Sequence, residues 1–121
     1  MSVGADPHER RTLGVLASLS GAVAVVAGAY GAHGASGVAA EWLKTGSHYQ
    51  LIHAVAALVA IGRPAGRLAG WCFIGGGGLF AATLYAMAFG APHWLGAVTP
   101  LGGMGLIIGW LALAVGAGRS R

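Results

Sequence analysis

Charged residues and cysteine are scarce in this sequence. Only 8% of its 121 residues are charged, where a soluble domain carries about 25%. The single cysteine, Cys72, cannot form an intrachain disulfide or build a cysteine-based metal site, and we interpret it as a small packing residue. What is abundant instead is apolar or small, since 56% of the residues are hydrophobic and 23 are glycine. The composition predicts an integral membrane protein.

Four long apolar runs predict four membrane-spanning helices. A helix needs about 20 apolar residues to cross the ~30 Å hydrocarbon core of a bilayer. The expected spans are about 12–32, 47–62, 68–89 and 97–117. The second run is the shortest and starts with polar residues, so it has the least support. We predict an all-α fold in one domain, a compact four-transmembrane-helix bundle.

The arginines predict how this bundle is oriented. Six arginines lie in the N-terminal leader, the 63–67 connection and the C-terminus, whereas the other two connections hold only Lys44. Because basic residues remain on the cytoplasmic side, both termini are expected in the cytoplasm. Asp6 and Glu9 before the first run favour an uncleaved first span over a signal peptide. The arginines do not form a patch with interleaved aromatics, so nucleic acid is not an expected partner.

Segment 37–46 precedes the second expected span on the outward side. It places Val38, Trp42 and Leu43 beside Glu41 and Lys44. One prediction is a short helix that lies at the outer interface, and the other is a solvated loop.

Small residues indicate how the helices pack. Gly14, Gly21 and Gly28 recur every seven residues, residues 75–78 are all glycine, and 105–109 is a GxxxG motif. Such faces let helices approach closely in lipid, where no hydrophobic effect drives them together. The pattern leaves open whether the GxxxG motif pairs helices within one chain or between two chains.

The stretch GSHYQLIHAV, residues 46–55, places polar side chains in the second span. Ser47 and Gln50 have the spacing of a capping box, in which each would satisfy a backbone N–H at the helix start without any ligand. His53 lies deeper, on the face shared by Tyr49 and Gln50. Two interpretations of His53 remain: a buried neutral imidazole that ties helices together, or a group that binds a ligand or carries a proton.

The other spans bring polar side chains to a similar depth. Tyr30, Tyr85 and Thr99 lie near outward helix ends, with His33 and His93 above them. Thr99-Pro100 either starts the fourth helix inside the bilayer or kinks a helix that begins at Leu95. We therefore predict a polar belt in the outer leaflet, made of His33, Tyr49, Gln50, His53, Tyr85 and Thr99.

The residue types of the polar belt favour binding over catalysis. No acidic residue lies at its depth, and the sequence has neither GxSxG nor HExxH, so an enzyme is the less expected class. A metal would require histidines without a carboxylate, and haem would require a large slot, so no cofactor is assigned.

The leading hypothesis is that the belt binds a small lipid-soluble ligand or a metal. The alternative is a non-catalytic accessory subunit or assembly factor, in which the belt is a structural clasp. Expected partners are membrane lipids, further copies of the chain or a larger membrane complex.

An ordered set of motifs resembles a known family. GAHG (31–34), YQLIH (49–53), TLY (83–85) and GAVTPLGG (96–103), followed by GW (109–110), are similar to the YgdD / transmembrane protein 256-like family of small inner-membrane proteins, domain of unknown function 423. The resemblance covers residues 12–117. It implies four spans in a bacterial inner membrane and no settled activity. Motif residues of the family would correspond to His33, Tyr49, Gln50, His53, Thr99, Pro100, Gly102 and Gly103.

Overall fold

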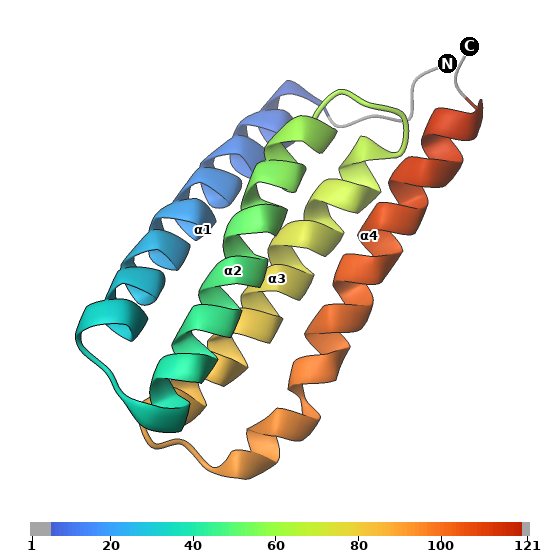
Figure 1. Cartoon of the computed structure of the whole chain (residues 1–121). Coiled ribbons are helices and arrows are strands. Elements are labelled where there is room, and N and C mark those ends of the chain that lie inside the picture. Colours follow the sequence, from blue (N-terminus) through green and yellow to red (C-terminus); the bar gives the residue numbers. More distant parts are fainter. Residues whose placement is uncertain (1–5, 120–121) are drawn as a thin grey trace.

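Four long helices make up most of residues 6–119 of the protein (Figure 1). The computed structural model describes residues 6–119. The helices are α1 (Pro7–His33), α2 (Gly37–Ala60), α3 (Gly66–Ala88) and α4 (Thr99–Arg119), with a short 3-10 helix, η1 (His93–Ala97), before α4. Residues 6–119 contain no strand. The predicted all-α, four-helix architecture is therefore confirmed.

Three of the helical segments are long and apolar enough to cross a membrane: Pro7–His33, Gly66–Ala88 and His93–Arg119. Helix α2 lies alongside them (Figure 1) but carries Glu41, Lys44 and the belt residues Tyr49, Gln50 and His53. Its 24 residues nevertheless extend over about 36 Å, longer than the ~30 Å hydrocarbon core.

Helix α2 begins ten residues earlier than the sequence predicts. Residues 37–46 are neither a separate interfacial helix nor a loop, because they form the first turns of one continuous α2. Ser36, in an extended conformation, occupies the N-cap position. The capping-box prediction for Ser47 and Gln50 is wrong, since both residues lie in the middle of the helix. The physical reason is that Ala40, Leu43 and Gly46 are buried against neighbouring helices, so packing continues the helix upstream of Ser47.

Each helix packs mainly on its neighbour in sequence, in the order α1, α2, α3 and α4 (Figure 1). The α2–α3 connection lies at the same end as the start of α1 and the end of α4. Arg10, Arg11, Arg63, Arg67 and Arg119 are consequently gathered at this end, which we call the arginine end. There the Arg67 Nε donates to the Glu9 Oε1 at 2.6 Å, and the Trp71 Nε1 donates to the Glu9 Oε2 at 3.1 Å. These two bonds connect α1 to α3.

Glycines set the closest helix contacts. A Cβ on Gly102 of α4 would lie 2.6 Å from the Gly76 O of α3, and one on Gly105 would lie 3.2 Å from the Gly76 Cα. A Cβ on Gly109 would meet the Phe73 ring at 2.6 Å. The GxxxG motif therefore pairs α4 with α3 inside one chain, which answers the question that the sequence left open. On α1, Gly28 makes room for Ser47 of α2.

Candidate functional site

His53 of α2 is buried against α4, with only 6% of its surface exposed. Its Nδ1 lies 2.6 Å from the carbonyl oxygen of Tyr49, one turn earlier in the helix. Its Nε2 lies 2.9 Å from the Trp110 Nε1 of α4, and an indole N–H can only donate. The imidazole is therefore neutral, with the proton on Nδ1, and both ring nitrogens are in use. Sequence reasoning missed Trp110 as the partner of His53, although it belongs to the GW motif.

Gln50 connects three helices. Its Nε2 donates to the Ser20 Oγ of α1 at 3.1 Å, and its Oε1 accepts from the Tyr85 hydroxyl of α3 at 2.7 Å. These lengths match the usual values for N–H···O and O–H···O bonds, which supports this orientation of the amide. Ser20 was also missed, and its only signal was its polarity within the first apolar run.

Three hydroxyl groups complete the links between helices, through two hydrogen bonds. The Ser47 Oγ donates to the Ala24 carbonyl of α1 at 2.6 Å. The Thr83 Oγ1 of α3 and the Thr99 Oγ1 of α4 lie 2.6 Å apart. Helix α4 starts at Thr99, so Pro100 lies in its first turn, where a missing N–H costs no helical bond. The helix does not begin at Leu95, which belongs to η1.

The six predicted belt residues do not form one cluster. Gln50 and Tyr85 bond to each other, His53 stacks parallel to the Tyr49 ring with centroids 6.3 Å apart, and Thr99 pairs with Thr83. His33 is exposed at the end of α1 and is not brought into these contacts. Tyr49 is 43% exposed, and its hydroxyl has no hydrogen-bond partner among residues 6–119.

The buried side chains of the polar belt are saturated with hydrogen bonds. Within the described residues, no buried side-chain nitrogen or oxygen lacks a partner. The same part of the chain contains no group of three His, Cys, Asp or Glu side chains able to hold a metal ion. The arrangement can therefore hold helices in register.

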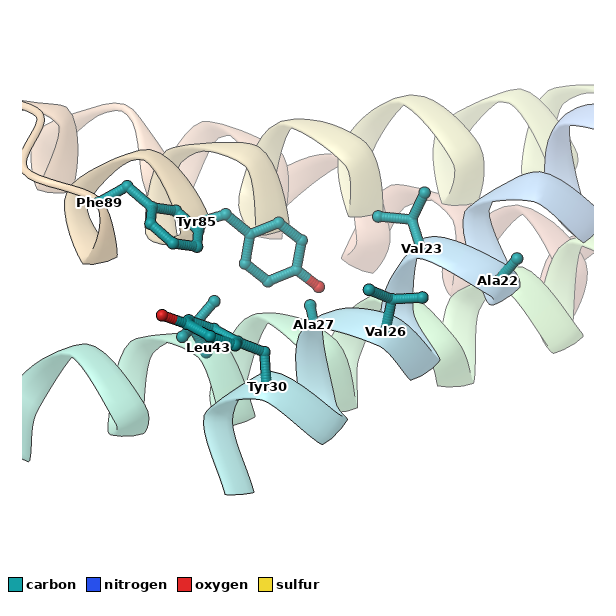
Figure 2. Close-up of a pocket in the computed structure, with 8 residues that line it drawn as sticks. All are labelled: Ala22, Val23, Val26, Ala27, Tyr30, Leu43, Tyr85 and Phe89. Carbon is teal, nitrogen blue, oxygen red and sulfur yellow. The ribbon is translucent and has the colours of Figure 1, made fainter. Parts of the chain in front are cut away.

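A mostly apolar groove lies between α1 and α3, beside the belt (Figure 2). Its volume is about 460 Å³, and it is open to the surroundings of the protein. The lining residues are Ala22, Val23, Val26, Ala27 and Tyr30 of α1, Leu43 of α2, and Tyr85 and Phe89 of α3. Tyr30 and Phe89 stack with their ring centroids 5.7 Å apart. Because its walls come from three helices, the groove cannot be predicted from any single sequence motif.

Comparisons with known proteins place the chain in a family. The model of a family described as a protein of unknown function, DUF423, matches residues 27–103. A UPF0382 membrane protein of Haemophilus influenzae is 38% identical over 88 residues, which cover 69% of this chain and 71% of that protein. The UPF0382 inner membrane protein YgdD of Escherichia coli is 34% identical over 89 residues, 66% of each chain. UPF0382 membrane protein YwdK of Bacillus subtilis is 35% identical over 80 residues, 60% of this chain and 65% of YwdK.

No solved structure matches the chain. The family match and the apolar helices agree with each other and with the motif resemblance. The chain belongs to the DUF423 family and is a helical protein of the inner membrane.

Proposed function

We propose that the chain is a non-catalytic accessory component of the inner membrane, and that its polar belt is a structural clasp. The observation that supports this most directly is the saturation of His53. Its Nε2 accepts from Trp110 and its Nδ1 donates to the Tyr49 carbonyl. A general base or a metal ligand needs a free nitrogen lone pair, and this imidazole has none to offer without breaking a bond between α2 and α4.

The geometry of the belt supports the clasp on all four helices. Its hydrogen bonds join α1 to α2, α2 to α3, α3 to α4 and α2 to α4. Hydrogen bonds between membrane helices contribute about 0.6 kcal/mol each on average, so the five together are worth about 3 kcal/mol. That is enough to select one helix register in a bundle built mainly from small side chains.

A lipid-soluble ligand at the belt is the second candidate, and Tyr49 favours it. Tyr49 lies about halfway along α2 and is 43% exposed, and its hydroxyl has no partner in the described part of the chain. A polar group at that depth in hydrocarbon needs a partner. A carbonyl or hydroxyl of a ligand could supply one, with its ring against Tyr49 and Phe80, whose centroids lie 4.8 Å apart.

One purification distinguishes the two candidates. The tagged protein is extracted at native expression levels in a mild detergent, and native mass spectrometry records both bound chains and bound small molecules. An accessory role predicts a second polypeptide at fixed stoichiometry, absent from an equally tagged, unrelated membrane protein. A lone chain without a partner would overturn the accessory role. A small bound mass that disappears in Tyr49→Phe would instead establish the ligand.

A further inference from the structure

The groove between α1 and α3 shares only Tyr85 with the clasp and has the dimensions of a ligand site. Its volume of about 460 Å³ falls within the range of about 300–1,000 Å³ that small-molecule sites occupy. Apart from two tyrosine hydroxyls, its lining side chains are hydrocarbon.

The groove suits a single hydrocarbon chain better than a helix. Its wall on α1 runs from Ala22 to Tyr30, a rise of about 12 Å. A helix with its side chains is about 10 Å in diameter, whereas an extended hydrocarbon chain is much narrower. Tyr30 of α1 and Phe89 of α3 stack at one end of the groove, so the narrower occupant fits between the two helices.

The two tyrosines give the groove a polar end and an apolar end. The Tyr85 hydroxyl donates to the Gln50 Oε1 at 2.7 Å, so its proton is not available to a ligand. The Tyr30 hydroxyl has no partner among residues 6–119, and Tyr30 lies with Phe89 at one end of the groove, while Ala22 lies at the other (Figure 2). Tyr30 is one turn from the end of α1, opposite the arginine end. Tyrosine at such a position is suited to the membrane interface.

We propose that this groove binds one hydrocarbon chain of a membrane lipid, with the polar part of that lipid beside Tyr30. The chain would then run from the interface, past Val26 and Val23, toward Ala22. This site does not depend on the accessory role, because the described residues of this chain form it by themselves.

Photolabelling tests the site. The purified protein is reconstituted into vesicles of phosphatidylethanolamine in which a small fraction of the lipid carries a diazirine on one acyl chain. Mass spectrometry then maps the labelled residues. We expect labels concentrated on residues 22–30 and 85–89. Ala22→Phe should lower labelling of residues 22–26 about fivefold, because the ring fills that end of the groove. Ala29→Phe, on the same helix but outside the lining, is the matched control and should leave labelling unchanged.

A second variant tests the groove with a substitution that should not disturb the fold. Val26 is 69% exposed, so Val26→Trp adds bulk from the open side and requires no room in the packed interior. Loss of labelling in this variant, with helical content unchanged, would support the site. Labels spread evenly over all exposed helix faces would overturn the proposal, because the groove would then be ordinary lipid-facing surface. Labelling that persists in both variants would overturn it as well, as would a cross-link between two copies of α1 through the groove.

Discussion

The imidazole of His53 takes part in two hydrogen bonds of opposite direction. Nδ1 donates within α2, and Nε2 accepts from Trp110 of α4. Protonation of the ring would place a donor opposite a donor and would break the link to Trp110. A neutral histidine can perform both roles at once, which neither asparagine nor leucine can reproduce at the same two positions.

A double-mutant cycle measures this link. His53→Leu and Trp110→Phe should each lower the free energy of unfolding, and the double variant should lose less than the two separate losses combined. We expect a coupling of about 0.6 kcal/mol, with about 1.7 kcal/mol as the upper bound for such bonds in membranes. Circular dichroism during unfolding in mixed micelles provides the measurement. Trp94→Phe, in the exposed η1, should show no coupling to His53→Leu. If the losses of unfolding free energy from His53→Leu and Trp110→Phe were fully additive, His53 would have no clasp role.

The sequence identified which polar side chains lie within the expected membrane spans, but not which residues are their hydrogen-bond partners. Depth follows from counting residues along a helix, and a helical face follows from 100° per residue. The partners Ser20 and Trp110 depend on how whole helices rotate and slide against each other. That arrangement is set by small residues such as Gly28 and Gly102, whose contacts exist only in the folded bundle.

The interface between α3 and α4 is built from backbone against backbone. Gly76 lies directly against Gly102 and Gly105, with hardly any side chain between the two helices. Dispersion contacts of this kind need close approach over several residues, so one added methyl group affects the whole pair of helices.

Adjacent glycines on α4 provide a matched test of that interface. A methyl group at Gly102 would lie 2.5 Å from the Phe80 N and 2.6 Å from the Gly76 O, whereas one at Gly103 would lie 4.0 Å from the Phe80 Cδ2. Gly102→Ala should therefore cost about 1–3 kcal/mol of unfolding free energy through overpacking. Gly103→Ala should be neutral or slightly stabilising, because alanine favours helix. Both are measured by the same micelle unfolding. Equal effects of the two substitutions would contradict the close α3–α4 contact.

Helix boundaries were predictable where a helix ends together with an apolar run of the sequence. The start of α2 was not predictable in this way. Polar residues at 47–50 indicate a helix end if the helix is considered alone. In the bundle, Ser47 and Gln50 face α1, and Gln50 also faces α3, so their polarity is satisfied by neighbouring helices rather than by water. The environment of Ser47 and Gln50 is set by other helices, and the sequence around these two residues carries no information about those helices.

Helices α1 and α3 are held together at one end of the molecule and separated at the other. At the arginine end, Glu9 of α1 accepts from Arg67 and Trp71 of α3. Toward the opposite end, the same two helices form the walls of the groove, and their contact at its end is the stack of Tyr30 on Phe89. The ion pair thus joins α1 to α3 at the arginine end, outside the space in which we place a lipid chain.

The crossing of α2 determines whether all four helices of the bundle span the membrane. Helix α2 is long enough to cross, but it is not among the three segments that are apolar enough by composition. We expect it to cross, because its polar side chains bond to α1, α3 and α4 instead of meeting lipid. Single cysteines at Ser36 and Ala65, in a Cys72→Ala background, report the two ends of α2.

A membrane-impermeant maleimide applied to right-side-out spheroplasts should label Ser36→Cys and should leave Ala65→Cys unlabelled until the membrane is permeabilised. This outcome follows from the retention of arginine-bearing connections in the cytoplasm. The reverse pattern would invert the molecule and place the groove in the inner leaflet. Labelling of both cysteines from one side would mean that α2 does not cross. Its hydrogen bonds to three crossing helices would then require those helices to be displaced as well, so this result would contradict the bundle as a whole.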